Sequence, residues 1–496
     1  MQKFILAIDQ GTTGTRSYIF DAKARVIGSS YREFTQHFPK PGWVEHDGLE
    51  IWDTVQATGR AALKAAGLKP ASIAAAGITN QRETTLLWDR KNSRPLHRAI
   101  VWQCRRTAAR CDQLKAQGRE KLFRRKTGLV LDAYFSGTKL EWLLKHVPGA
   151  MARARRGELA FGTIDSWLLW QLTGGIAHLT DHSNASRTLL YDIDKQQWDP
   201  EILKILGIPA SLLPKVQAPS SLFGLSSAKS FLGPGVPIAG MVGDQQGALF
   251  GQGCVDPGSM KNTYGTGCFL LLNLGKKFRL SENNLLTTLV CDPFGKPAYG
   301  LEGAVFIAGA AIQWLRDGLQ IIKSSPESEA LATSVDSNHG VYMVPAFVGL
   351  GAPYWDQHAR GAIVGLTRGS TKAHIARAAL ESLAYQTRDL VEAMQKDSGL
   401  EVTELRVDGG ACKNNFLMQF QADILGARIN RPKTVETTAL GAAFLAGLRV
   451  GYWKNAAELA RLRATDRVFK PKMKPAERKA LYQGWNEAVE RVLEKR

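Results

Sequence analysis

The chain has 496 residues, too many for one compact core, so we expect two large domains. Hydrophobic residues make up 44% and charged residues 22%, a balance typical of a globular rather than a disordered protein. The formal net charge is +19, but lysine and arginine are scattered and not gathered in one stretch with interleaved aromatics. We therefore expect no nucleic-acid partner, although the charge could steer an anionic substrate.

No apolar run approaches the roughly 18 residues that cross a bilayer. The N-terminal apolar stretch is too short for a signal peptide and lacks a small-residue cleavage site. The six cysteines form no CxxC pair, which favours reduced thiols over disulfides or a metal site. We therefore expect a cytoplasmic protein without membrane insertion.

The first predicted elements form a hairpin: a buried strand at Phe4–Ile8, a Gly/Thr-rich turn at Asp9–Arg16 and a strand at Ser17–Phe20. Backbone N–H groups and hydroxyls in such a turn can bind phosphate, although the order is neither that of a Walker A loop nor GxGxxG. Asp9, at the end of the strand, is placed to hold Mg²⁺ through water. The alternative is an ordinary tight hairpin in which Asp9 is a turn residue.

The next polar segment, residues 76–85, follows an apolar strand start and contains Arg82 and Glu83. Adjacent residues point to opposite faces of a strand, so both line one pocket only where the backbone turns. A carboxylate accepts from vicinal hydroxyls and a guanidinium donates to their oxygens, a combination that suits a polyol. A solvent-exposed, salt-bridged loop is the alternative. Trp102, Tyr134 and Phe269 could add an apolar wall or could simply be core.

A second buried strand, predicted at Val236–Met241, is followed by Asp244 and Gln245 between glycines. Polar side chains at the end of a buried strand are costly for a pure core. Asp244 could accept a proton from an attacking hydroxyl, or it could cap a helix that starts near Gly247.

A second Gly/Thr hairpin at Thr263–Gly267 resembles the first and predicts two domains of related architecture, with the two tips facing a cleft. We place the boundary near Gly251–Gly253, which gives domains 1–251 and 252–496. Strands and helices then alternate, which is typical of α/β layers; they are predicted at His374–Met394, Glu404–Val407, Phe416–Leu425 and Thr437–Gly447. Between strand and helix, Gly409 and Gly410 would allow close approach of a ribose or ring. A plain turn with Asn414 as helix N-cap is the alternative.

Several long stretches carry a resemblance to a known family. They are GITNQRETT (77–85), IVWQCRRTA (100–108), YFSGTKL (134–140), GDQQGALFGQ (243–252), KNTYGTGCF (261–269) and VPAFVGLGAPYWD (344–356). The chain resembles the FGGY carbohydrate kinases nearly end to end, and among them the branch that acts on glycerol. The resemblance implies an α/β fold of two RNase H-like domains of the actin/Hsp70 ATPase type, with the active site in the interdomain cleft. It also implies ATP-dependent phosphorylation of glycerol to sn-glycerol 3-phosphate, the first step of glycerol catabolism, by a homo-oligomer (dimer or tetramer).

The resemblance also implies residue roles. Asp244 matches the general base, and Asp9 the carboxylate near Mg²⁺. The positions that match glycerol contacts are Arg82, Glu83, Tyr134, Asp244 and Gln245, with Trp102 and Phe269 as the aromatic wall. The positions that match ATP contacts are Thr12, Thr13, Gly14, Arg16, Thr266, Gly309, Gln313, Gly410 and Asn414.

This chain departs from the family pattern at several points. Gly14 stands where the family often has serine, so a hydroxyl contact would be lost and a backbone contact kept. The stretch 230–236, which matches a fructose 1,6-bisphosphate loop in some members, contains no arginine, and the region has no histidine of the kind phosphorylated in some Gram-positive members. We therefore expect neither control by fructose 1,6-bisphosphate nor control by histidine phosphorylation. The rival functions are an FGGY kinase for xylulose, gluconate or a longer polyol, and a non-catalytic ATP-binding switch of the actin or Hsp70 type.

Overall fold

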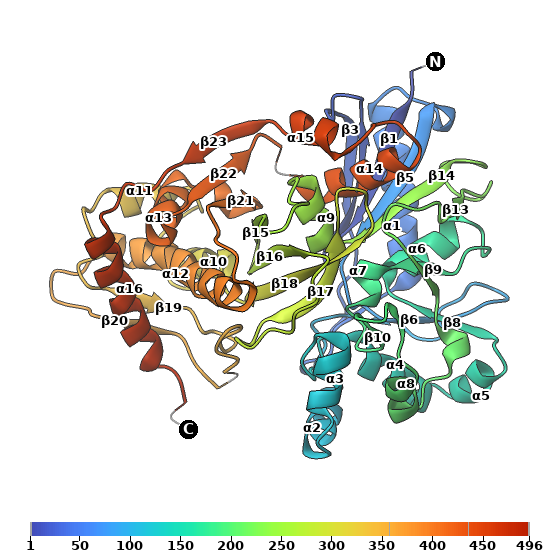
Figure 1. The fold of residues 1–496 in the computed structure, drawn as a ribbon, viewed down its shortest axis with the longest axis horizontal. Coiled ribbons are helices and arrows are strands. Elements are labelled where there is room, and N and C mark those ends of the chain that lie inside the picture. The colour runs from blue at the N-terminus through green and yellow to red at the C-terminus, as the bar shows by residue number, and fades with distance from the viewer. Residues whose placement is uncertain (1, 357, 435, 495–496) are drawn as a thin grey trace.

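The structure is a computed structural model that describes residues 2–356, 358–434 and 436–494. It has two lobes, each built around a mixed β-sheet (Figure 1). The first sheet has the strand order β13-β14-β5-β1-β2-β3, and the second has the order β17-β18-β16-β15-β21-β22-β23. The predicted α/β class with two related domains is therefore confirmed.

The strands are β1 (Phe4–Gln10), β2 (Gly14–Phe20), β3 (Val26–Glu33), β4 (Glu45–His46), β5 (Ile73–Asn80), β6 (Leu86–Asp89), β7 (Ala99–Ile100), β8 (Leu159–Gly162), β9 (Leu179–Asp181), β10 (Tyr191–Asp192), β11 (Gln197–Trp198), β12 (Lys215–Gln217), β13 (Gly224–Leu225), β14 (Pro237–Gly243), β15 (Met260–Tyr264), β16 (Cys268–Gly275), β17 (Leu286–Cys291), β18 (Pro297–Val305), β19 (Tyr342–Val344), β20 (Ala362–Val364), β21 (Glu404–Asp408), β22 (Arg428–Pro432) and β23 (Thr465–Phe469). The α-helices are α1 (Gly48–Ala65), α2 (Ala108–Ala116), α3 (Glu120–Thr127), α4 (Ser136–His146), α5 (Ala150–Arg155), α6 (Ile164–Leu172), α7 (His182–Ala185), α8 (Pro200–Leu206), α9 (Asp244–Gly251), α10 (Gly309–Asp317), α11 (Glu327–Thr333), α12 (Lys372–Ser398), α13 (Asn415–Leu425), α14 (Thr437–Arg449), α15 (Ala456–Leu462) and α16 (Pro475–Glu490).

The two sheets repeat one topology. In the first lobe β1, β2 and β3 pair antiparallel, and β5 and β14 then add in parallel beside β1. In the second lobe β15, β16 and β18 pair antiparallel, and β21 and β22 add in parallel beside β15. The similarity of the two hairpins in the sequence therefore reflects two copies of one sheet architecture.

The parallel strands of the first sheet end level with one another. Asp9 pairs with Thr79, and Asn80 pairs with Gly243, so the chain leaves β1, β5 and β14 at one edge. The predicted first turn is shorter than expected, because Asp9 and Arg16 still pair with each other in the hairpin ladder. Loops at the carboxyl edge of an α/β sheet are the usual place for a ligand site.

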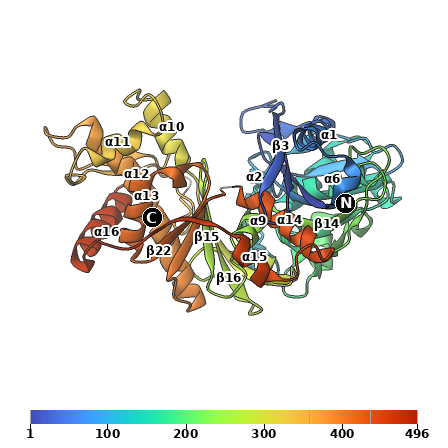
Figure 2. The same cartoon turned by 90° about the horizontal axis from the view of Figure 1, so that it is seen from above.

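Helix α14 belongs to the second half of the chain but packs on the first lobe. The sequence predicted a helix at Thr437–Gly447, and the structure forms one at Thr437–Arg449. It comes from the second half of the chain but lies against the first sheet and α9 (Figures 1 and 2). Glycines make this contact close: a Cβ on Gly77 would lie 2.2 Å from the Ala442 carbonyl oxygen, and one on Gly441 would lie 1.9 Å from that of Gly247.

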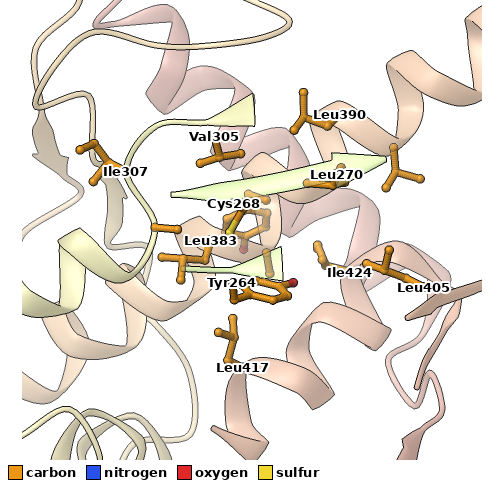
Figure 3. Close-up of a cluster of buried hydrophobic side chains, with 14 of the residues drawn as sticks. Tyr264, Cys268, Leu270, Val305, Ile307, Leu383, Leu390, Leu405, Leu417 and Ile424 are labelled. Carbon is orange, nitrogen blue, oxygen red and sulfur yellow. The ribbon is translucent and has the colours of Figure 1, made fainter. Parts of the chain in front are cut away.

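The core of the second lobe fixes the base of its Gly/Thr turn. Leu270 and Val305 of the sheet pack with Leu383 of α12 and Leu417 of α13 (Figure 3). Tyr264, the last residue of β15, is fully buried, and its hydroxyl donates to Gln421 Oε1 at 2.6 Å. The strand end that precedes the turn is therefore rigidly held.

All six cysteines are buried free thiols. Among the helices of the described residues, none has both the length and the apolar character needed to traverse a lipid bilayer.

Candidate active site between the lobes

The carboxyl edge of the first sheet places Asp244 at the start of α9. The helix begins at Asp244 itself, earlier than the predicted start near Gly247, and Gly243 occupies the N-cap position. The Asp244 carboxylate accepts from the Gln245 N–H at 2.7 Å and lies 3.2 Å from Nε of Arg82. Its side chain is 29% exposed and therefore accessible, whereas the Arg82 side chain is 2% exposed.

Arg82 and Glu83 follow β5 and do lie on one side of the chain. Glu83 has φ +61°, a left-handed conformation that breaks the strand alternation. The Arg82 guanidinium and the Glu83 carboxylate are 3.8 Å apart. Because both side chains are buried, the solvent-exposed loop considered from the sequence is excluded.

Two further charged residues complete this cluster. Arg187 donates through Nε to Glu83 at 2.6 Å and through Nη2 to Glu302 at 3.0 Å. Glu302, on β18 of the second lobe, also accepts from both Nη atoms of Arg82. Two guanidiniums and two carboxylates thus alternate around a closed ring that spans the lobes.

The carboxyl groups at this edge are electrostatically perturbed. Burial raises the pKa of Asp244, and the Arg82 guanidinium opposes the rise. Burial, with added repulsion from Asp244 and Glu436, raises the pKa of Asp9 to about 7 against the opposing charge of Arg16. Carboxylates that repel one another in a half-buried site favour a proton or a cation between them.

Aromatic rings adjoin the charged cluster. The Trp102 and Tyr134 rings meet edge to face with centroids 5.5 Å apart, and Arg187 lies over the Tyr134 ring at 5.6 Å. The Trp102 indole N–H donates to Thr12 Oγ1 at 3.0 Å, which links this wall to the first Gly/Thr turn. Phe269 lies on β16 of the second lobe, directly opposite Ala304.

The first Gly/Thr turn exposes Thr13, while Gly14 is buried. A Cβ on Gly14 would lie 2.4 Å from the Tyr31 ring, so Tyr31 occupies the space that a serine side chain would need. Tyr31 in turn lies under the Arg16 guanidinium at 4.9 Å. The departure from serine at this position therefore accompanies a tyrosine that packs on Arg16.

The second Gly/Thr turn packs against the start of α10. Gly309 N–H donates to the Gly265 carbonyl at 3.0 Å, and the Ala308 and Ala310 N–H groups donate to the Thr266 carbonyl. Gln313 is exposed further along the same helix. The structure thus brings Thr266 and Gly309 together and leaves both accessible at one edge.

Gly409 and Gly410 lie beside this turn, because β21 runs parallel to β15 with Asp408 opposite Thr263. A Cβ on Gly409 would lie 2.3 Å from the Tyr264 carbonyl oxygen. Asn414 is the N-cap of α13, and its side chain accepts from the Leu417 N–H. The capping role considered from the sequence is therefore present, and the amide nitrogen of Asn414 is not used by the cap.

Sequence reasoning missed three charged residues of the site: Arg187, Glu302 and Lys261. Lys261 is buried on β15 and donates to Gln245 Oε1 at 2.5 Å, which fixes the orientation of that amide. The available signal for Glu302 was a single charge inside the largely apolar strand 297–305, whereas Lys261 lies in the more polar strand 260–264. Such a charge must find a partner, because burying it alone is costly.

Comparison with known proteins agrees with this geometry. The solved xylulose kinase of Lactobacillus acidophilus superposes with a TM-score of 0.88 at 23% identity, over 98% of this chain and 97% of that one. The fold is therefore that of the two-lobed sugar kinases. Models of the FGGY family of carbohydrate kinases match residues 4–251 with the N-terminal domain and residues 260–450 with the C-terminal domain. The chain belongs to the FGGY family of carbohydrate kinases.

Within the family, the chain is similar to several proteins named glycerol kinase. The chain is 58% identical over 493 residues to a glycerol kinase of Alkaliphilus metalliredigens, covering 99% of both chains. It is 60% identical over 490 residues to a glycerol kinase of Deinococcus radiodurans, covering 99% of this chain and 97% of the relative. The crystal structure of Plasmodium falciparum glycerol kinase with ADP superposes with a TM-score of 0.94 at 38% identity, over 100% of this chain and 99% of that one.

Proposed function

We propose that the chain transfers the γ-phosphoryl group of ATP to a terminal hydroxyl of glycerol, giving sn-glycerol 3-phosphate and ADP. The observation that carries the proposal is the group of Arg82, Glu83 and Asp244 beside the Trp102–Tyr134 wall. A carboxylate and a guanidinium can bind vicinal hydroxyls while the rings cover the carbon atoms. The end-to-end identity to named glycerol kinases supports glycerol over xylulose, gluconate or a longer polyol.

Asp244 is the group we expect to take the proton from the attacking hydroxyl. Its carboxylate is accessible, and its raised pKa makes it a better base than an ordinary aspartate. Arg82, 3.2 Å away, lowers the pKa of Asp244 in opposition to burial, and we propose that it helps to hold the substrate oxygen beside this carboxylate. We propose contacts to the same substrate from Glu83, Tyr134 and Gln245, with Trp102 and Phe269 against its carbon atoms.

The nucleotide is proposed to lie between the two Gly/Thr turns. Backbone N–H groups and hydroxyls at Thr12, Thr13 and Gly14, with Arg16, would hold phosphates on the first lobe. Thr266, Gly309, Gln313, Gly410 and Asn414 would hold the rest of the nucleotide on the second. Phosphoryl transfer of this kind depends on positioning and charge neutralisation more than on covalent help.

Asp9 is the residue we propose to face Mg²⁺. The described residues contain no group of three or more side chains placed to bind a metal alone, and Mg²⁺ typically uses one or two carboxylates with waters and substrate phosphates. The crowding of Asp9, Asp244 and Glu436 fits a cation. When bound, Mg²⁺ would neutralise charge on the transferred phosphate.

We infer a cytoplasmic location from the six free thiols. We infer a homo-oligomer, a dimer or tetramer, from the family resemblance alone. We propose a domain boundary at 251/252; α14 follows this boundary in the sequence and lies against the first sheet.

The direct test is a coupled assay of ADP release with ATP, Mg²⁺ and a matched panel of three- to six-carbon polyols and sugars. We expect glycerol to give the highest kcat/KM, at least about 10-fold above any longer polyol. A higher kcat/KM with xylulose or gluconate would reject glycerol as the substrate. ATP binding without polyol-dependent turnover would reject the kinase in favour of a nucleotide-dependent switch.

A further inference from the structure

Glu302 is a charged residue of the second lobe. It lies on a strand whose Glu302-bearing face is turned toward the first lobe. It lies on β18 directly opposite Leu271, and directly opposite residues of an antiparallel pair share a face. Leu271 packs with Leu249 of α9, the helix that Asp244 begins. The face that carries Glu302 therefore points toward the proposed polyol site.

Among the described residues, the side-chain hydrogen bonds to the Glu302 carboxylate come from Arg82 and Arg187 of the first lobe. Oε2 and Oε1 accept from Nη1 and Nη2 of Arg82, and Oε1 also accepts from Nη2 of Arg187 at 3.0 Å. These partners are 220 and 115 residues away along the chain. The Glu302 side chain is 1% exposed, so the ion pairs are shielded from water and from salt.

These contacts fix which donors of Arg82 remain for other partners. The carboxylate of Glu302 takes both Nη atoms in a bidentate pair, and Nη1 also donates to Gln246 at 3.2 Å. Nε is left facing Asp244. Without Glu302 the guanidinium would be free to rotate and pair bidentately with Asp244, which would occupy the proposed base.

We propose that Glu302 is a positioning residue of the polyol site: it holds the guanidiniums of Arg82 and Arg187, so that the first-lobe site is complete only when β18 of the second lobe is in place. The inference rests on the proposed function. It assigns no substrate contact to Glu302 itself. An ion pair that only stabilised the contact between the lobes would affect the free energy of unfolding and leave the KM for glycerol unchanged. A positioning residue would change the KM for glycerol, so kinetics distinguish the two roles.

The ionisation of Glu302 agrees with this role. Burial alone would raise the pKa of Glu302, but the Arg187 and Arg82 guanidiniums outweigh burial and hold the pKa at about 2. The carboxylate is therefore charged throughout the pH range of an assay. Any pH effect of replacing it must come from another group.

The test is Glu302→Gln in the full-length chain, assayed with glycerol, ATP and Mg²⁺. We expect KM for glycerol to rise by about 10- to 100-fold, because a buried charge-assisted pair is lost, while KM for ATP stays within about 2-fold. We also expect the acid limb of the kcat profile to move to lower pH, because the pKa of Asp244 falls when the repulsion from Glu302 is removed and falls further if a guanidinium turns onto Asp244. Glu302→Asp keeps the charge and should give a KM for glycerol between those of the parent and Glu302→Gln. If the glutamine variant does not fold, the KM of this aspartate variant is the measurement that tests the proposal.

A matched control is Glu381→Gln. Glu381 is equally buried, on α12 of the second lobe, and it pairs with Arg377 at 2.8 Å and with Asn338 at 3.0 Å. This variant should lower Tm without changing KM for glycerol. The proposal is overturned if Glu302→Gln keeps its glycerol KM within about 2-fold of the parent, or loses glycerol and ATP affinity equally. Absence of glycerol-dependent turnover in the parent chain would instead overturn the proposed function.

Discussion

At the scale of single residues, ionised Asp9 destabilises the ligand-free fold. A cation bound beside this carboxylate would remove that destabilisation. Burial, Asp244 and Glu436 raise the pKa of Asp9 to about 7, whereas an unfolded aspartate has a pKa of about 3.8. Between these values the folded protein keeps a proton that the unfolded chain has released. The free energy of unfolding therefore falls as pH rises from about 4 to about 7, and the loss is complete above that range.

Asp9→Asn tests this account. At pH 8 the substitution removes a carboxylate that the ligand-free fold disfavours, so Tm of the ligand-free protein should rise by about 1–3 °C. Turnover should fall by at least about 10-fold, because the proposed Mg²⁺ ligand is lost. Calorimetry without ligands and steady-state kinetics check the two effects separately. A lower Tm at pH 8, with unchanged kinetics, would reject both parts.

The residues of the site differ in how far the sequence predicts them. Arg82, Glu83 and Asp244 stand in dense polar segments that follow apolar strands, so the strand ends alone indicate a site. Glu302 is a single charge among apolar neighbours, and its partner Arg82 is 220 residues away. Arg187 and its partner Glu83 are separated by 104 residues. No local pattern identifies such partners, because only the folded chain brings Arg187 to Glu83 within the first lobe, and only the packing of the two lobes brings Glu302 to Arg82.

At the scale of elements, α9 and α14 cross with their backbones in close contact. The backbones touch through glycines: a Cβ on Gly441 would lie 1.9 Å from the Gly247 carbonyl oxygen, and one on Gly251 would lie 2.0 Å from that of Thr437. The neighbouring atoms are backbone and cannot rotate away. Because α9 begins with Asp244, this crossing also fixes the position of the proposed base.

Gly441→Ala should therefore destabilise the protein by about 1–3 kcal/mol through overpacking. Denaturant unfolding monitored by tryptophan fluorescence measures the change. Gly369→Ala is the control, since its Cβ would meet only Thr367 Oγ1 at 3.9 Å and should leave stability unchanged. If Gly441→Ala and Gly369→Ala had the same free energy of unfolding, α9 and α14 could move apart without destabilising the protein, and the account of their close contact would be wrong.

The helix itself could be predicted, but not its location. Alanine and glycine at Thr437–Gly447 indicate a closely packed helix, and the structure forms it at Thr437–Arg449. Its sequence position assigns it to the second domain, whereas it packs against β1, β5 and β14. The apolar pattern shows that a helix has a buried face and does not show which sheet covers it.

At the scale of the whole molecule, two copies of one sheet architecture present their carboxyl edges to a shared site. The duplicated hairpins let the sequence predict the α/β class and the two related domains, because both turns combine glycine and threonine between apolar strands. The closed, buried ring of Arg82, Glu83, Arg187 and Glu302 then joins the lobes beside the proposed polyol site. On the proposal made above, substrate binding therefore depends on both lobes.

The most direct test of the account is kcat of Asp244→Asn with saturating glycerol and ATP. Asparagine keeps the shape of the side chain but cannot take a proton, so we predict a fall in kcat of at least about 10² with Tm close to that of the parent. A kcat near that of the parent chain would contradict the placement of the proton acceptor at this position, and with it the site described between the two lobes.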